Sequence, residues 1–357
     1  MNMKPLTEYC TLNMGQSPDS KTYNEQGNGI PFYQGNADFG EVHPKTRVWC
    51  SAPVKIAEDG DILISVRAPI GAMNMSVERC CIGRGLAAIT PIRERCDKQF
   101  LYYALQSKVD SLIAQGTGST FKAISKKVLE ATPIPAYNIE DQQKITERLC
   151  RVDNAIAARR EQLKSMEQLV KSRFIELFDD PMNGTSKWKV STIGEQFNVT
   201  SGGTPATGEK AYWDNGTIPW IGSNMCQDTI LIKNDGKFIT EEGYIHSSAK
   251  WFYKGTVLVA LVGATIGKTA LLRFDTTTNQ NIAAIDVNEN AAFSSEFVFY
   301  HMQMLYAKFM EIGNGKFKMA NQGFIRQLPL VCPPLALQQR FAAFVEQVDK
   351  SKYYSVA

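Results

Sequence analysis

Residues 142–153 read QQKITERLCRVD, and residues 338–349 read QQRFAAFVEQVD. Both stretches open with two glutamines, end in Val-Asp and follow a segment that contains several prolines. They start 196 positions apart in a chain of 357 residues. Because a chain of this length usually folds as more than one domain, the spacing suggests that one folding unit occurs twice.

Other segments repeat in the same order. GIPFYQGN at residue 29 returns as TIPWIGSN at 217, GDILIS at 60 returns as GTVLVA at 255, and GRGLAAI at 83 returns as NQNIAAI at 279. The offset grows from 188 to 196 and then stays nearly constant. This period is far longer than the roughly 20–50 residues of solenoid repeats. The sequence therefore predicts a duplicated domain, with a helix at the end of each copy.

The composition is that of an ordinary globular protein, with 44% hydrophobic and 21% charged residues. The net charge is only +3, so a nucleic-acid surface would have to be local or shared with a partner. The eight cysteines form no Cys-x-x-Cys pair, which argues against a metal site and favours reduced thiols in the cytoplasm. We expect no secretory signal and no membrane span, because the N-terminus lacks an apolar segment and no apolar run is long enough.

The stretch TVLVALVGATIGKTALL, from residue 256, resembles the start of a nucleotide-binding loop. A Walker loop needs a glycine five positions before the Gly-Lys pair. That position is Val262, the nearby glycine is Gly263, and the first copy has no lysine there. We therefore interpret the segment as a buried strand that leads into a glycine turn.

No proline or glycine occurs from residue 140 to 178, and apolar residues recur there at steps of three, four and seven. This spacing predicts a helix of about 55–60 Å with a heptad seam, which needs a helical partner. The predicted seam residues are Ile145, Leu149, Val152, Ile156, Leu163, Met166, Val170 and Leu177. A surface helix that only connects two domains is the alternative.

The second copy offers a partner helix. Residues 337–348 repeat the start of the first helix, with Phe341, Phe344 or Val345, and Val348 at seam positions. Only eight residues follow Asp349. We expect a shortened second helix: either the C-terminus is truncated, or another chain, such as a second copy of this one, completes the bundle.

These features together resemble the specificity subunit of type I restriction–modification systems. The resemblance rests on the paired segments IPFYQGN and IPWIGSN, on the strands GDILIS and GTVLVA, and on the passages PIPAYNIEDQQKI and LPLVCPPLALQQRF into the helices. Each match is short, but their order and their duplication cover nearly the whole chain.

The resemblance implies an α+β fold with two tandem, similar α/β target recognition domains joined by long coiled-coil-type helices. We assign residues 1–139 and 181–335 to the two recognition domains, and residues 140–180 and 336–357 to two spacer helices. In the family, each domain reads half of a split double-stranded DNA target. The helices set the spacing and dock methyltransferase subunits, and restriction subunits then join. The resemblance also implies that this chain is not an enzyme and holds no cofactor, because S-adenosylmethionine, ATP and magnesium act on the partner subunits.

Loops that recur in both copies are the best candidates for DNA contact, because Arg, Lys and small polar side chains on loops bind phosphates and bases. The glycine-rich loop at residues 116–122 is expected to open a short helix. Arg67 and Arg84 correspond to Val262 and Gln280, a difference that suits guanine in one half-site and adenine in the other. The full candidate set is Arg67, Arg84, Thr117, Ser119, Lys122, Lys126, Ser223, Asn224, Lys268, Gln280, Asn281, Lys316 and Lys318.

Structural interpretations of these candidates stay open. Arg67 would then only end a strand, Ser119 would cap a solvated helix, and Gln280 would satisfy buried backbone groups. Two other functions also stay open: a coiled-coil assembly protein whose globular units bind protein, and a nucleotide-binding enzyme that uses the loop at residues 263–269. A steep loss of DNA affinity as salt rises would favour the DNA-reading function.

Overall fold

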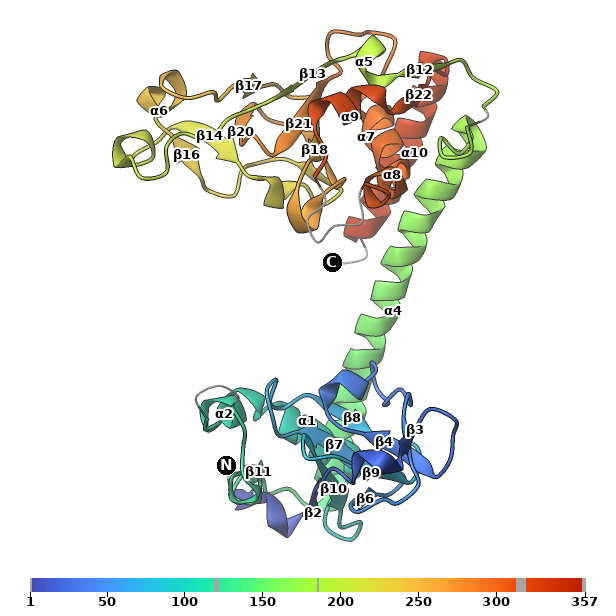
Figure 1. Ribbon diagram of the computed structural model, residues 1–357, viewed down its shortest axis with the longest axis vertical. Helices are drawn as coiled ribbons and strands as arrows, with labels where there is room; N and C mark the ends of the chain where they lie inside the picture. Colours follow the sequence, from blue (N-terminus) through green and yellow to red (C-terminus); the bar gives the residue numbers. More distant parts are fainter. Residues whose placement is uncertain (1, 119–121, 185, 313–318, 355–357) are drawn as a thin grey trace. The chain divides into compact units, whose positions relative to one another are not determined.

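The computed structural model describes residues 2–118, 122–184, 186–312 and 319–354, which form two compact units, Met1–Ala158 and Arg159–Ala357 (Figure 1). Each unit contains strands, helices and its own hydrophobic core, as expected for the α+β class. Within the described ranges, no helix combines the length and the apolar character needed to cross a membrane.

The first unit is built on a four-stranded antiparallel sheet in the order β2-β10-β7-β8. Its strands are Cys10–Met14, Leu86–Pro91, Ile62–Ser65 and Met73–Met75. Because side chains alternate along a strand, Ile62 and Ile64 pack under the helices while Leu63 packs on the opposite face. The sheet is therefore buried on both sides.

Helices cover one face of this sheet and a second sheet covers the other. The helices are α1 (Lys98–Gln106), α2 (Val109–Ala114) and α3 (Lys126–Glu130). The second sheet has the order β3-β5-β4-β9-β6, formed by Tyr23–Asn24, Trp49–Cys50, Ile30–Tyr33, Cys80–Ile82 and Ile56–Ala57. A small antiparallel sheet joins β1 (Met3–Pro5) to β11 (Pro133–Pro135) just before the long helix.

The second unit repeats this topology. Its central sheet has the order β13-β21-β18-β19-β15, formed by Asn198–Ser201, Ile282–Asp286, Val257–Ala260, Thr269–Leu272 and Thr229–Leu231. Its second sheet has the order β16-β14-β20-β17, formed by Phe238–Ile239, Ile218–Ile221, Thr276–Thr278 and Trp251–Phe252. The remaining elements are the paired strands β12 (Val190–Thr192) and β22 (Pro329–Val331), and the helices α5 (Ile193–Gln196), α6 (Glu241–Ile245), α7 (Ser295–Met304), α8 (Tyr306–Met310) and α9 (Gln322–Gln327).

The register is repeated as well as the strand order. Strands β4 and β9 pair in parallel through Phe32 and Cys81, and β14 and β20 pair in parallel through Trp220 and Thr277. This parallel pair lies inside an otherwise antiparallel second sheet in both units. The predicted duplication of one folding unit is therefore confirmed.

A buried glutamine ties the start of each long helix to its unit. In the first unit, Gln142 donates from Nε2 to the carbonyls of Tyr137 (2.9 Å) and Arg95 (3.1 Å), and its Oε1 accepts from the amide of Asp97 (2.8 Å). Gln338 makes the same three bonds in the second unit, with the Pro333 and Ala292 carbonyls and the Ser294 amide. Both glutamines are fully buried.

The helix α4 (Ile139–Phe178) occupies the predicted range, but its buried residues differ from the predicted seam. Val170, Phe174 and Phe178 are buried at steps of four, whereas the seam continued from Val170 to Leu177, which is only half-buried. Leu149, Val152 and Ile156 are exposed. The predicted seam residues Met166 and Leu177 are partly buried against the same core cluster as Val170, and globular elements of the unit contribute to that packing.

A phenylalanine cluster forms that end. The ring of Phe341, from α10 (Leu335–Tyr354), lies 5.5 Å from the rings of both Phe174 and Phe178. Phe297 of α7 stacks on Phe174 at 5.7 Å. Residues 159–178 of α4 and helix α10 run in opposite directions (Figure 1). The second helix thus meets the first as expected, through a cluster shared with α7.

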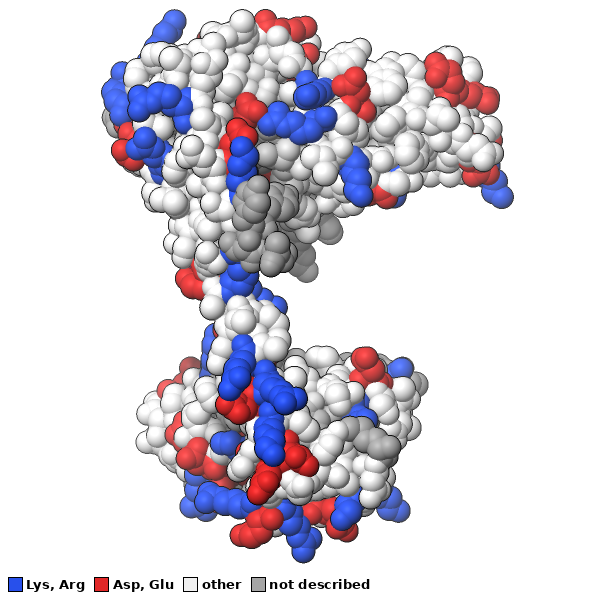
Figure 2. All heavy atoms as spheres, turned by 180° about the vertical axis from the view of Figure 1, so that it is seen from behind, with Lys and Arg blue, Asp and Glu red and all other residues white. Residues whose placement is uncertain are grey.

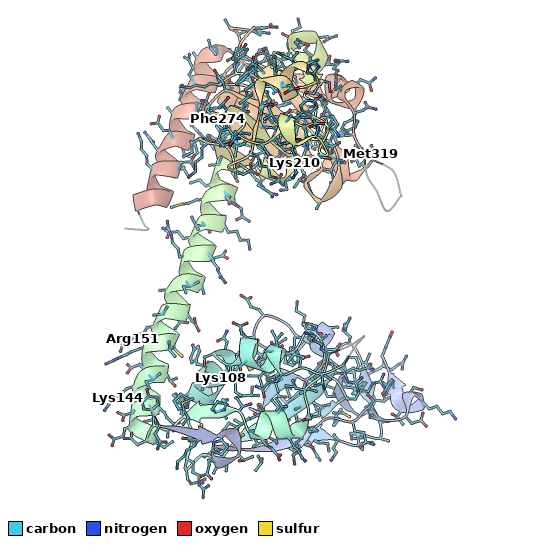
Figure 3. All side chains as sticks on the ribbon, turned by 90° about the vertical axis from the view of Figure 1, so that its left-hand side faces the viewer. Lys108, Lys144, Arg151, Lys210, Phe274 and Met319 are labelled. Atoms are coloured by element: carbon cyan, nitrogen blue, oxygen red, sulfur yellow. The ribbon has the colours of Figure 1, made fainter. Side chains whose placement is uncertain are left out.

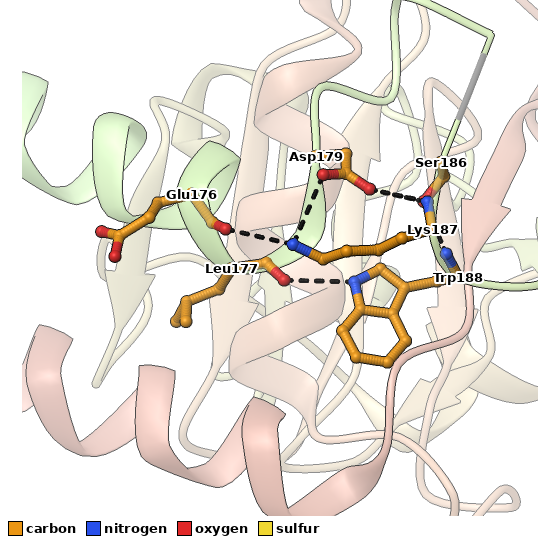
Figure 4. Close-up of polar contacts among 6 residues, drawn as sticks. All are labelled: Glu176, Leu177, Asp179, Ser186, Lys187 and Trp188. Atoms are coloured by element: carbon orange, nitrogen blue, oxygen red, sulfur yellow. Dashed lines mark hydrogen bonds and ion pairs between the residues drawn. The ribbon is translucent and has the colours of Figure 1, made fainter.

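Side chains from the following loop satisfy the end of α4 (Figure 4). Asp179 has a positive φ of 66°, and its carboxylate accepts from the Lys187 amide (2.8 Å) and the Ser186 hydroxyl (3.1 Å). These hydrogen bonds, led by the one from the Lys187 amide, lower the pKa of Asp179. The indole of Trp188 donates to the carbonyl of Leu177 (3.1 Å), one of the carbonyls that a helix end leaves free.

We expect Gln338→Ala to destabilise the second unit by about 2–4 kcal/mol, because it leaves one amide and two carbonyls without partners in a buried site. Urea unfolding followed by tryptophan fluorescence measures this, since Trp188, Trp213, Trp220 and Trp251 all lie in the second unit. The control is Gln339→Ala, at the exposed neighbouring position. Equal stability of the two variants would contradict the proposed role of the buried glutamine.

The buried His301 predicts a pH dependence of stability. Burial lowers the pKa of His301 from 6.5 to about 4, although its Nε2 donates to the carbonyl of Pro329 (2.8 Å). Below pH 6.5 the unfolded chain therefore binds a proton that the folded chain excludes, so the free energy of unfolding falls by about 3 kcal/mol as pH drops toward 4.

His301→Gln retains a donor for Pro329 and removes the titration. Its unfolding free energy, measured in urea from pH 7 to 4.5, should depend less on pH than that of the wild type. The exposed His246 provides the matched control, and His246→Gln should keep the wild-type slope. A wild-type slope in His301→Gln would rule out this origin of the pH dependence.

Candidate nucleic-acid interface

Five loops of the first unit lie side by side and form one surface, which we call the first rim. These loops are residues 15–17, 34–35, 67–69, 83–85 and 117–123. Residues 119–121 of the last loop lie outside the described residues. Backbone hydrogen bonds join these loops. The Gly85 amide donates to Gln34 (3.2 Å), the Val66 amide to Gly85 (2.9 Å), and the Ala68 amide to Lys122 (3.0 Å). The rim is therefore fixed by the main chain, and its side chains are free to vary.

Arg84 stands at the tip of the turn between β9 and β10. A Cβ on Gly83 would come within 2.9 Å of the Gln34 backbone, and one on Gly85 within 2.5 Å of the Gln34 carbonyl oxygen. The amide of Arg84 also donates to the hydroxyl of Ser17 (3.3 Å). Because the glycines pack closely beneath the turn, only the exposed side chain of Arg84 projects from it.

The same framework appears in the second unit, and we call it the second rim: residues 202–205, 222–224, 261–265, 279–281 and 319. The Leu261 amide donates to Asn281 (2.8 Å), and the Asn279 amide donates to Ile221 (3.1 Å). Val262 pairs with Met319, which is exposed at the edge of this unit (Figure 3). The tip residue here is Gln280, which is also exposed.

Sequence reasoning missed one loop of each rim. Ser17 and Thr204 contact the two tip residues: Ser17 accepts from the Arg84 amide, and Thr204 donates its hydroxyl to Oε1 of Gln280 (2.5 Å). The signal was present, because GQSP at residue 15 and GGTP at residue 202 share a Gly-x-Ser/Thr-Pro pattern. It is short and carries no charge, so it does not stand out without the fold.

The structure brings most of the predicted contact residues to the rims. Arg67, Arg84 and Lys122 are exposed on the first rim, and no carboxylate in the described ranges pairs with any of them. Ser223, Asn224, Gln280 and Asn281 lie on the second rim. Thr117 exchanges two backbone hydrogen bonds with Ala123 at the base of its loop. The candidates Ser119, Lys316 and Lys318 lie outside the described residues.

One expectation about the first rim is wrong. The loop at residues 116–122 was expected to open a short helix that continues through Lys126 and Lys127, but among its described residues Thr117 forms a bridge with Ala123. Helix α3 begins only at Lys126, after Ser125. Lys126 itself pairs with Glu130 at 3.4 Å along the helix. The two backbone hydrogen bonds between Thr117 and Ala123 are incompatible with a helix that begins before Ala123.

Lys268 and its loop do not form a phosphate cradle. The ammonium of Lys268 pairs with Asp228 (2.5 Å) and lies 4.8 Å from the centre of the Tyr306 ring. The loop joins the antiparallel strands β18 and β19, whereas a Walker loop leads from a strand into a helix. The geometry argues against the nucleotide-binding alternative and gives Lys268 an internal partner.

The two rims differ in charge. The described part of the first rim carries Arg67, Arg84 and Lys122 and no acidic residue, whereas the described part of the second rim carries no charged residue. Elsewhere, basic and acidic side chains are interspersed, as on the face drawn in Figure 2. Among the described residues, the positive charge of the rims thus lies on the first rim, whereas Lys316 and Lys318 of the second unit lie outside the described residues.

Helix α4 carries the second candidate surface, an apolar stripe formed by Leu149, Val152 and Ile156. These side chains are 38%, 55% and 45% exposed. Lys144 and Arg151 project from α4 away from the globular part of the first unit (Figure 3). An apolar stripe at helical spacing on an otherwise charged helix is typical of a docking surface for another helix.

The described residues offer little chemistry for catalysis. No group of His, Cys, Asp and Glu side chains among them is arranged to hold a metal. Burial raises the pKa of the Cys10, Cys96 and Cys226 thiols to about 12, so they stay protonated at neutral pH. The rims present guanidinium, amide and hydroxyl groups, which donate and accept hydrogen bonds.

A family model for the "Type I restriction modification DNA specificity domain" matches residues 1–168 and 185–353. The chain belongs to this family. The two matched ranges correspond to the two repeated units, so the tandem of specificity domains is confirmed.

Known proteins of this kind are similar to parts of the chain. A protein from Methanocaldococcus jannaschii, provisionally described as the type I restriction enzyme MjaX specificity subunit, is 42% identical over 164 residues, which cover 46% of this chain and 39% of that protein. The EcoR124I/EcoR124II specificity subunit of Escherichia coli is 28% identical over 199 residues, which cover 54% of this chain and 48% of that protein. The chain therefore spans less than half the length of these curated relatives.

A solved structure shares the fold over nearly the full chain. The type I restriction–modification S subunit from M. genitalium gives a TM-score of 0.56 at 16% identity, covering 99% of this chain and 90% of that one. At this identity the likeness concerns the fold alone.

We expect Gly85→Ala to weaken DNA binding by at least about tenfold. The new Cβ would meet the Gln34 carbonyl, an overpacking that costs roughly 1–3 kcal/mol, and the tip would be displaced to relieve it. The measurement is fluorescence anisotropy with a duplex that contains the target. Gly35→Ala is the control on the same rim, since nothing lies within 4 Å of its added Cβ. Wild-type affinity in Gly85→Ala would separate the first rim from DNA binding.

Proposed function

We propose that this chain is the DNA-specificity subunit of a type I restriction–modification complex and that each unit reads one half of a bipartite double-stranded DNA target. The observation that carries this proposal is the pair of rims. One main-chain framework occurs twice and presents different side chains each time. Reading two unlike half-sites requires this combination, because the backbone sets the approach to DNA and the side chains set the sequence.

The rims match the chemistry of base recognition. Arginine donates to the guanine edge in the major groove, and glutamine or asparagine pairs with adenine. Exposed Arg67 and Arg84 on one rim, and Gln280 and Asn281 on the other, supply these groups. Lys122 supplies a cation for a phosphate. We propose these residues, with Thr117, Ser223 and Asn224, as the DNA contacts among the described candidates.

The helices are proposed to set the distance between half-sites and to dock methyltransferase subunits. The exposed stripe of Leu149, Val152 and Ile156 supports this role, because it lies outside both globular cores. Restriction subunits then join through the methyltransferase complex. A second copy of this chain, pairing through α10, is the alternative occupant of the stripe.

On this proposal the chain catalyses nothing itself. Methyltransferase subunits transfer a methyl group from S-adenosylmethionine to adenine, and restriction subunits use ATP and magnesium. The contribution of this chain is selective binding, for which the rims have suitable donors and acceptors. Membership of the specificity-domain family supports this division of labour.

The test is co-expression with candidate methyltransferase subunits in a host without adenine methylation, followed by sequencing of methylated adenines. We expect one bipartite motif with a fixed gap. Affinity of the purified complex for that duplex should fall steeply with salt, as phosphate contacts require. Flat, negligible binding by an assembled complex would favour an assembly protein that does not read DNA.

The same experiment tests the docking stripe. Leu149→Asp with Ile156→Asp should abolish both assembly and methylation, while the free energy of unfolding changes by less than about 0.5 kcal/mol because both side chains are exposed. Val54→Asp with Val77→Asp is the matched control, since these exposed aliphatic residues lie in the first unit outside α4. Unchanged methylation with unchanged spacing in the helix variant would exclude the stripe as the dock.

A further inference from the structure

The turns β9–β10 and β20–β21 occupy the same place in the two units and differ in the residue at their tip. Arg84 and Gln280 both follow a strand that pairs in parallel with the Ile-Pro strand, and both precede an inner strand, β10 or β21, of the other sheet of their unit. The residues on either side of the tip differ too, with glycines at 83 and 85 and asparagines at 279 and 281. The position in the fold is equivalent, so the two tips present different side chains at the same place.

The side chain of Arg84 is available to donate hydrogen bonds to an acceptor on a ligand. Its backbone is held by Ser17 and by the close packing of Gly83 and Gly85 against Gln34. Its guanidinium makes no hydrogen bond or ion pair with any residue that the structure describes. A planar group with five donors matches the O6 and N7 acceptors of guanine in a bidentate pair.

The side chain of Gln280 differs from that of Arg84 because it already has a hydrogen-bond partner within the protein. Thr204 donates to its Oε1 at 2.5 Å, which identifies the oxygen end of the amide and uses one of its two lone pairs. No described residue accepts from its Nε2. The second lone pair and the Nε2 donors together match the N6 donor and N7 acceptor of adenine.

A phosphate contact alone does not account for the exchange of side chains between the two tips. Glutamine and arginine side chains both donate hydrogen bonds to phosphates, but a guanidinium and a carboxamide match the edges of different purines. A base contact therefore explains why the side chain differs at equivalent positions, and the salt dependence of binding separates a base contact from a phosphate contact.

We propose, on the basis of the proposed function, that Arg84 contacts a guanine in one half-site and Gln280 contacts an adenine in the other. The tip residue of each rim then fixes the identity of one base pair. Thr204 acts as a positioning residue for Gln280, and Ser17 acts as a positioning residue for Arg84.

The test is a reciprocal exchange in the complex with methyltransferase subunits. Arg84→Gln should change one position of the first half-site from guanine to adenine, and Gln280→Arg should change one position of the second half-site from adenine to guanine. Competition with duplexes altered at that base should show a change in preference of about 5- to 100-fold, the range expected for one bidentate contact. The other half-site should keep its sequence in each variant.

Arg79→Gln is the matched control, because Arg79 is exposed in the same unit, lies outside the rim and pairs only with Glu58 at 3.6 Å. Arg84→Lys keeps the charge and loses the bidentate geometry, so it should lose the guanine preference while the salt dependence of binding stays unchanged. Circular dichroism of each variant confirms that it is folded.

Three outcomes decide the matter. The exchanged motifs support the proposal. Unchanged motifs in both exchanges overturn it, as does a folded Arg84→Gln complex whose affinity falls equally for all duplexes with a smaller salt dependence, which indicates a phosphate contact. In both of these cases the wild-type complex still methylates a bipartite motif. Absence of any wild-type motif would instead contradict the proposed function.

Discussion

The structure depends on one interaction that occurs twice, the buried glutamine in the first turn of each long helix. Gln142 and Gln338 each bridge the carbonyl before the helix, a loop carbonyl and the amide of the residue that caps α1 or α7. Three buried backbone groups would lack a partner without this side chain. Because the bonds are directional, they fix the helix relative to its unit in a way that apolar packing alone would not. A neighbouring feature is similar in the two units: Tyr103 donates to Asp153 of α4 (2.6 Å), and the pKa of the equivalent Tyr300 is raised by burial and by the charge of Asp349 in α10.

The anchored sheets also hold the loops of the rims in place. In each unit the same sheet that packs against the helices also supports the loops of the rim, through the strand that begins just after Arg84 or Gln280. The loops are joined by main-chain hydrogen bonds, so a change of side chain leaves the framework in place. A scaffold of this kind lets recognition diverge between two copies without loss of the fold. Among the described residues, the first rim carries basic side chains and the second carries amides.

Much of the fold was predictable because the duplication supplied an internal comparison. Buried strands such as ILIS and VLVA, and the break-free helix at residues 140–178, gave strong local signals. The errors came where tertiary packing overrode a local pattern. Phe174 and Phe178 replaced Leu177 as buried residues because the last turns of α4 pack on α7 and α10 rather than on one helix. Helix α3 begins only at Lys126, because Ala123 pairs with both Thr117 and Arg67.

By itself, the sequence determined that one α+β unit occurs twice, that a long helix follows each copy and that Arg67 and Arg84 are exchanged for Val262 and Gln280. Repetition and periodicity are properties of the linear sequence, so they can be recognised without knowledge of the fold. Only the tertiary structure decided which loops meet in a rim, that Ser17 and Thr204 contact the tip residues, and that Lys268 has an internal partner in Asp228. The reason is physical: hydrogen bonds and ion pairs depend on distances between segments far apart in the chain, and only the folded sheets set those distances.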